Sequence, residues 1–185
     1  DGHLWFILDA LPAGKSRTYA LELGAASAGD AKAVRLKALK TRIDISLAGK
    51  AFTSYVFAPK KCGKHVLRRP YFFPVLGPGQ VEMTRPFPMI QKDLADNVKL
   101  DHPHHTGIYV AHGYVNGVDN WSITPEAGYI VHTAFEATDA GAVLGQVRET
   151  LDWTDVNGKK TLAETRTIRT YALGDSLRML DLELT

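Results

Sequence analysis

The sequence predicts an all-β protein, an antiparallel β-sandwich with little helix. Several segments alternate apolar and polar residues with the period of two that strands with one buried face require. Turn-forming combinations of Gly, Asn, Asp and Pro separate these segments at short intervals. No long segment carries the 3.6-residue apolar period of an amphipathic helix. Together these patterns favour stacked antiparallel sheets.

Composition limits the classes of function. With 185 residues, 45% of them hydrophobic, the chain is long enough for one domain with a sizeable core. The net charge of +2 implies no strong attraction to nucleic acid or anionic membranes, so we expect no nucleic-acid partner. The one cysteine, Cys62, excludes an internal disulfide framework. No apolar run approaches the roughly 18 residues of a membrane span, so we expect a soluble protein, either cytoplasmic or exported.

Two domain segments are expected. Residues 1–30 predict N-terminal strands at Leu4–Leu8 and Thr18–Leu23, which would end a preceding β segment, and residues 25–30 are the best linker. Residues 31–185 form the predicted sandwich domain. We expect it to be truncated at its C-terminus, because residues 180–185 alternate like a strand and then stop.

The first half of the domain predicts strands joined by tight turns. Residues 31–40 mix both periods, and a strand is preferred because Ile43 and Ile45 continue an alternating pattern. Residues 42–47 and 51–57 flank Ala48-Gly-Lys50 and predict a hairpin. Residues 81–85 predict a short strand, and residues 89–100 could carry one helical turn. A rigid, non-helical path is expected over residues 71–79, which hold two prolines and two glycines.

The only basic cluster lies between these strands. It predicts a solvated loop more strongly than a phosphate or sugar-acid site. Its members are Lys60, Lys61, Lys64, Arg68 and Arg69.

Four regular strands are predicted after Trp121. The strongest turn signal between them is Asn157-Gly158, since both residues tolerate the positive φ of a type I′ hairpin. The predicted strands are residues 129–135, 142–153, 161–171 and 176–184.

The candidate site centres on Asp101–Trp121, which holds four of the seven histidines: His102, His104, His105 and His112. On an extended segment, His102 and His104 would point the same way, about 7 Å apart, and His105 would point oppositely. Residues 107–111 predict a strand buried on both faces. Because neutral imidazole binds transition metals and also suits acid–base chemistry, both roles stay open. A divalent transition metal would take His102, His104 and His112, whereas the isolated His132 is expected to be a packing residue.

Later strands offer further acid–base groups. Glu164, Arg166 and Ile168 share one strand face, so Glu164 and Arg166 predict a structural ion pair that could also line a pocket. The rings of Tyr71, Tyr109 and Trp121 could stack on a sugar, and Arg85 could bind its hydroxyls or carboxylates.

Specific motifs resemble the PmoA-like family over roughly residues 42–185. They are Tyr71-Phe-Phe-Pro-Val-Leu-Gly-Pro, Met83-Thr-Arg-Pro-Phe-Pro-Met, Asp101-His-Pro-His-His and Ala111-His-Gly-Tyr-Val-Asn-Gly-Val-Asp. Members of that family are bacterial proteins named after a methane oxygenase subunit. The resemblance implies a β-sandwich protein, which could be part of a galactose-mutarotase-like supersandwich. It also implies a carbohydrate-handling role, because members often occur beside sugar-active enzymes.

The leading hypothesis is therefore action on a sugar or glycoside through a histidine-centred acid–base or metal-assisted site. The expected catalytic residues are His102, His104, His105, His112 and Glu164, and the expected substrate-binding residues are Arg85, Asp101, Asn116, Asp119 and Trp121. Asp101 would also orient an imidazole. Two alternatives are a copper- or iron-dependent oxidative enzyme and a non-catalytic carbohydrate-binding module.

Overall fold

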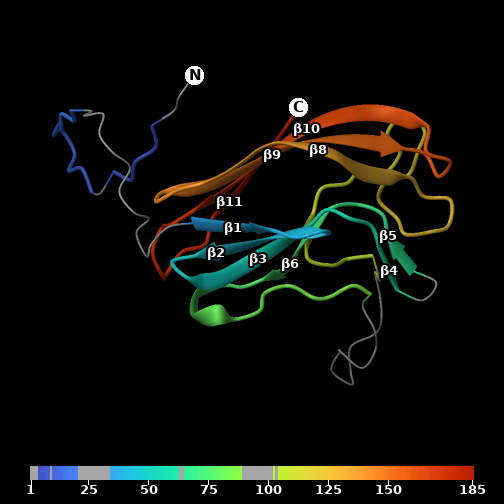
Figure 1. The fold of residues 1–185 in the computed structure, drawn as a ribbon, viewed down its shortest axis with the longest axis horizontal. Helices are drawn as coiled ribbons and strands as arrows, with labels where there is room; N and C mark the ends of the chain where they lie inside the picture. The colour runs from blue at the N-terminus through green and yellow to red at the C-terminus, as the bar shows by residue number, and fades with distance from the viewer. Residues whose placement is uncertain (1–3, 9, 21–33, 63–64, 89–101, 103) are drawn as a thin grey trace.

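The computed structural model describes residues 4–8, 10–20, 34–62, 65–88, 102 and 104–185. Two antiparallel sheets pack face to face (Figure 1), which confirms the predicted all-β sandwich. Within these residues, the one helical element is the short 3₁₀ turn η1, Pro78–Gln80, inside a stretch predicted to be non-helical. None of the described helical structure has the length and apolar character needed to cross a membrane.

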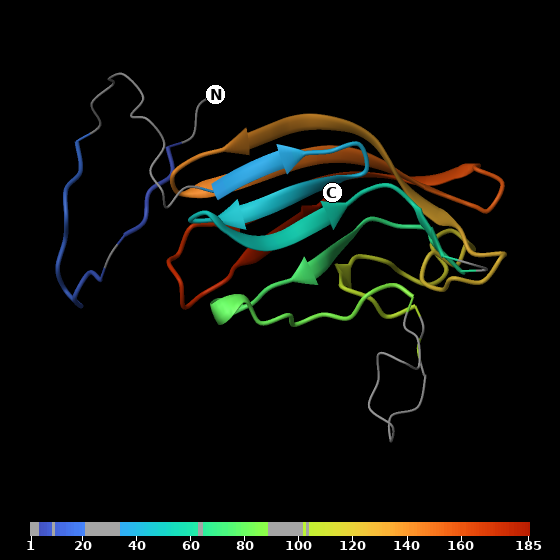
Figure 2. The same ribbon diagram turned by 60° about the horizontal axis from the view of Figure 1, so that its bottom comes forward.

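The first sheet has the strand order β1-β2-β3-β6-β7 and holds the predicted hairpin, β2 with β3. Its edge strand β7 has two residues, and Ile108 is 39% exposed, so the prediction of a longer strand buried on both faces is wrong. β7 is short because the chain on both sides of it leaves the sheet to form loops (Figure 2). The strands are β1 (Val34–Ala38), β2 (Arg42–Leu47), β3 (Lys50–Val56), β6 (Tyr71–Val75) and β7 (Ile108–Tyr109).

The second sheet has the order β11-β10-β9-β8 and contains all four strands predicted after Trp121. The turn at 157–158 differs from the prediction. Gly158 has a positive φ, whereas Asn157 does not. The Asp155 carboxylate accepts hydrogen bonds from the amides of Asn157 and Lys159 and so shapes the turn. The strands are β8 (Tyr129–Ala140), β9 (Leu144–Thr154), β10 (Lys160–Tyr171) and β11 (Leu180–Leu184).

The main core lies between the two sheets. Alternating residues of β2, Ile43, Ile45 and Leu47, point inward and pack in one cluster with Val147 of β9 and Ile168 of β10. The inward rows of β9 and β10 also carry charged residues, which are described below with the candidate site. Every second residue of these strands therefore faces the core, as the alternation of apolar and polar residues in the sequence predicts.

Some predicted strands are absent. Residues 4–8 and 18–20 form no strand, and the remaining predictions for residues 21–23, 25–30 and 89–100 lie outside the described residues. Residues 81–85 also form no strand, because the chain there makes one isolated bridge, Leu76 with Glu82, in place of a continuous ladder.

The basic cluster is not simply a solvated loop. The exposed Lys60 and Lys61 belong to a small hairpin of β4 (Lys60–Cys62) and β5 (His65–Leu67). Arg68 and Arg69 are buried instead, because backbone carbonyls and aromatic rings surround their guanidinium groups. Arg68 donates to the carbonyls of Thr124 and Ala127.

Candidate functional site

The histidines before β7 lie in a turn. The amide of His105 donates to the carbonyl of His102 at 2.9 Å, and His102 has a φ of 40°. The chain is therefore not extended here, and the prediction that His105 points away from His102 and His104 is wrong. The rings of His102 and His105 stack with centroids 4.7 Å apart, and the His104 ring meets that of His105 at 4.4 Å.

Trp121 completes a cluster with these rings. Its centroid lies 6.0 Å from those of both His104 and His105, and 5.5 Å from that of Tyr109. The cluster is open to solvent at Trp121, which is 39% exposed. We call His102, His104, His105 and Trp121 the histidine cluster. It offers a partly exposed aromatic surface next to several ring nitrogens.

Arg69 lies behind the cluster. Its guanidinium carbon is 4.2 Å from the centre of the Tyr109 ring, and its Nη1 donates to the carbonyl of Asn120 at 3.0 Å. Arg69 is 2% exposed, and its Nε and Nη2 have no hydrogen-bond partner within the described residues. Burial lowers the pKa of Arg69, with Tyr109 and Asp119 opposing that shift.

This surrounding charge acts on His104. Burial lowers the pKa of His104, and the positive charges of its neighbours, among them Arg69 and Arg85, lower it further. Because the ordinary pKa of histidine is about 6.5, His104 is neutral at pH 7 and can accept a proton. Burial also raises the pKa of Tyr109, which keeps its hydroxyl protonated.

An open cleft of about 620 Å³ lies beside the cluster, lined by residues 82–85, 105–107 and 109. Two chain segments form its walls and are held together by hydrogen bonds. Arg85 Nε donates to the carbonyl of His105 at 2.9 Å, and the Arg85 carbonyl accepts from the Thr106 hydroxyl and the Gly107 amide, both at 3.1 Å. His105 and Tyr109 belong both to the cleft and to the ring contacts of the cluster.

Gly107 allows these segments to approach the first sheet. Its φ is +50°, and a β-carbon built there would lie 2.1 Å from the carbonyl oxygen of Phe72 on β6. Any other residue would push the chain away from β6, so the position of β7 and Tyr109 depends on this glycine.

Two predicted substrate-binding residues have structural roles in the loop from β7 to β8. Asn116 and Gly117 both have positive φ and form a two-residue turn between Val115 and Val118, as type I′ geometry requires. The Asn116 side chain donates to the carbonyl of Thr161 on β10 at 2.8 Å.

The Asp119 carboxylate accepts hydrogen bonds from the amides of Trp121 and Ser122, at 2.8 and 3.0 Å. Although burial acts to raise it, the pKa of Asp119 is lowered by these hydrogen bonds and by the charge of Arg69. Asp119 therefore holds Trp121 in place.

The predicted metal set is not brought together. His112 is exposed, and the described ring contacts of the cluster do not include it. In the part of the chain that the structure describes, no three His, Cys, Asp or Glu side chains are arranged to hold a metal ion. Asp101, expected to orient an imidazole, lies outside the described residues.

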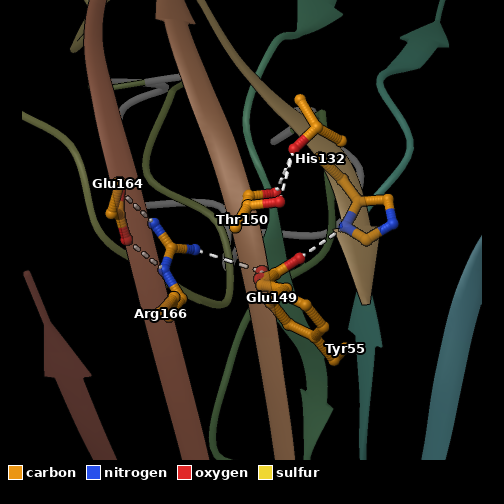
Figure 3. Close-up of polar contacts among 7 residues, drawn as sticks. Tyr55, His132, Glu149, Thr150, Glu164 and Arg166 are labelled. Carbon is orange, nitrogen blue, oxygen red and sulfur yellow. Dashed lines mark hydrogen bonds and ion pairs between the residues drawn. The ribbon is translucent and has the colours of Figure 1, made fainter. Parts of the chain in front are cut away.

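Glu164 belongs to a different place, a buried polar network between the sheets (Figure 3). Arg166 donates to both carboxylate oxygens of Glu164, at 2.7 and 3.1 Å, so the predicted pair of these residues is confirmed as a buried ion pair. Trp153 Nε1 also donates to Glu164, at 2.6 Å.

Arg166 and the hydroxyl of Tyr55 on β3 join this ion pair to Glu149. Arg166 Nη1 donates to Tyr55 at 3.1 Å, and the Tyr55 hydroxyl donates to Glu149. Glu149 is fully buried and also accepts from His132 Nδ1 at 2.7 Å, while the second ring nitrogen of His132 points away (Figure 3). Burial raises the pKa of Glu149, and the hydrogen bonds from Tyr55 and His132 offset only part of that effect.

The site residue that sequence reasoning missed is Arg69. Its partners, Asn120 and Tyr109, lie about 40 to 50 positions along the chain, so no local pattern reports them. One signal was present: Arg69 stands two residues before the aromatic strand β6, which makes a free loop position improbable.

Comparison with known proteins identifies the family. The model described as "Family of unknown function (DUF6807)" matches residues 42–185, which include the second sheet, every strand of the first sheet except β1, and the histidine cluster. The chain belongs to this family. No curated protein and no solved structure matches the chain.

Proposed function

We propose that the protein acts on a sugar or glycoside by proton transfer at the histidine cluster. The observation that carries this proposal is the contact of the His104 and His105 rings with a partly exposed tryptophan, beside an open cleft. Sugar rings pack their C–H faces on such exposed aromatic rings, while their hydroxyls need hydrogen-bonding groups at the rim.

His104 is the general base in this proposal. Its lowered pKa keeps the imidazole neutral near pH 7, which is the form that can remove a proton from a sugar hydroxyl or an acidic C–H. His105 lies against His104 and lines the cleft, so it is placed to contact the substrate directly. Tyr109, kept protonated by its raised pKa, supplies a hydroxyl donor in the same cleft.

The resemblance of the histidine motif to the PmoA-like family supports a carbohydrate-handling role. The cleft volume of about 620 Å³ also falls within the range of sites that hold small ligands. Glu164 has no part in this proposal, because it lies in the buried network between the sheets.

The test is a screen of the wild-type chain for anomer exchange of free sugars by NMR and for cleavage of aryl glycosides. On any substrate turned over, His104→Ala should lower the rate by about 10²- to 10⁴-fold, the contribution of a general base. His65→Ala on β5 is the matched control and should leave the rate unchanged, since His65 is outside the cluster. An unchanged rate in folded His104→Ala would disprove the proposal.

A binding module without catalysis is the second candidate, favoured by the exposure of Trp121 and of Tyr114, which is 77% exposed. It predicts that Trp121→Ala abolishes sugar binding while His104→Ala leaves binding intact and no sugar is turned over. Turnover that depends on His104 would exclude it.

A further inference from the structure

We infer that the cleft takes a sugar acid, with the substrate carboxylate bound by the guanidinium of Arg85. This rests on the proposed function for the sugar ring and adds the charge of the ligand. The grounds are the hydrogen-bonding state of Arg85, the charges around it and the composition of the cleft wall.

The Arg85 side chain is held in place by one hydrogen bond, and its terminal N–H groups are still available to a ligand. Its Nε donates to the carbonyl of His105, and its own carbonyl accepts from Thr106 and Gly107. Within the described residues, Nη1 and Nη2 make no further hydrogen bond, and neither is among the buried side-chain atoms that lack a partner. Two terminal N–H groups on a fixed plane match the two oxygens of a carboxylate.

A second arginine reinforces the positive charge. Arg69 is buried behind Tyr109 with two unpaired donors, and both arginines act on the pKa of His104. A buried cation with unused donors costs free energy, and a nearby anion would offset part of that cost. Asp119 is the carboxylate that acts on Arg69 among the described groups, and it already accepts two backbone amides.

Glu82 on the cleft wall favours a carboxylate over a phosphate. A phosphate monoester carries nearly two negative charges at pH 7, so Glu82 in the same cleft would repel it more strongly. A sugar acid has one charge and several hydroxyls. Its carboxylate can pair with Arg85 while its hydroxyls donate to Glu82, so the two side chains together orient the ligand.

The test is titration calorimetry on the full chain with glucuronate, glucose and glucose 6-phosphate as probes. Wild-type protein should bind glucuronate about tenfold tighter than glucose, as expected for one charge-assisted pair. Arg85→Gln should reduce the glucuronate affinity to that for glucose, and Arg85→Lys should reduce it by a smaller factor. Arg148→Gln, on an exposed arginine of β9, is the control and should change neither affinity.

Equal affinities of wild type for glucuronate and glucose would overturn the inference, as would a preference that survives in Arg85→Gln. Tighter binding of glucose 6-phosphate that depends on Arg85 would overturn it in favour of a phosphate ligand. If Arg85→Gln does not fold, as judged by circular dichroism, the Arg85→Lys result decides, and an unchanged preference there refutes the inference. Binding is measured without turnover, so failure here leaves the His104 rate test of the proposed function intact.

Discussion

The buried network and the histidine cluster are both polar groups among aromatic rings, yet they differ in what remains unpaired. In the network, Glu149 and Glu164 each accept two or more hydrogen bonds, and the sheets seal both carboxylates from water. At the cluster, Arg69 keeps two unpaired donors, and the side chain of Trp121 is partly exposed.

This difference separates structure from ligand binding. In the buried network all acceptors are already hydrogen-bonded and water is excluded, so no group is left to bind a ligand. The free-energy cost of burying these charges is offset only if every partner is present. The terminal N–H groups of Arg85, by contrast, lie on an open cleft and can still bind a ligand. Substitutions in the network should therefore change stability, whereas those at the cluster should change binding and turnover.

The largest expected effect is that of Arg166→Met. It leaves Glu149 and Glu164 buried without their cation, so the free energy of unfolding should fall by about 3–5 kcal/mol. Urea titration measures this loss. Arg169→Met, on the opposite face of β10, removes an ion pair with the exposed Glu183 and should cost less than about 1 kcal/mol. Equal losses in both variants would mean that the network is not a stabilising unit.

Glu149→Gln should have an intermediate effect that depends on pH. At acid pH the variant lacks the hydrogen-bonded carboxyl group of Glu149, which should cost about 1–3 kcal/mol. Since burial raises the folded-state pKa of Glu149 above its ordinary value of 4.5, the stabilisation from this carboxyl is fully present below that value. It is lost as the pH rises through the folded pKa.

The difference in stability between wild type and Glu149→Gln should therefore shrink from pH 4 to pH 8, as urea titrations at several pH values would show. Glu136→Gln, at an exposed residue of β8 that pairs with Arg148, is the control, and an equal trend there would show that the trend does not come from the buried carboxyl. A difference that grows with pH would contradict the raised pKa.

The smallest effect on stability, combined with a large effect on binding, is expected for Asp119→Ala. The variant loses the two amide bonds that hold Trp121 and Ser122, which should cost about 1 kcal/mol. Sugar affinity should fall about tenfold, because Trp121 is no longer positioned. Asp155→Ala removes an equivalent pair of amide bonds at the β9–β10 turn and is the matched control: similar stability loss, unchanged affinity. Equal sugar affinities in the two variants would contradict the assignment of ligand binding to the histidine cluster.

Local patterns were sufficient for β2, β3 and the four strands of the second sheet. The alternation of Ile43, Ile45 and Leu47 identified β2 and its core face, and the pair of Glu164 and Arg166 was found from their spacing of two. Residues 81–85 alternate in the same way but lack a partner ladder, and a pattern within one segment cannot report a missing partner.

The site was harder to predict because turns and distant contacts decide it. The spacing of His102, His104 and His105 gave opposite directions only for an extended chain, and one backbone hydrogen bond between His102 and His105 reverses that result. Likewise, the Asn-Gly pair at 116–117 forms the turn with two positive φ values that was expected at 157–158, where the carboxylate of Asp155 sets a different geometry.

Gly107 has a consequence for how this family can vary. Its missing β-carbon leaves room for the carbonyl of Phe72, so a substitution there would displace β7 and with it one wall of the cleft. Gly113, six residues later, has nothing within 4 Å of the position of a β-carbon and can accept a side chain. In a library of random variants, position 107 should therefore be nearly invariant among active clones, whereas position 113 should vary. The loop after β7 can thus change in sequence, while the contact between Gly107 and β6 cannot.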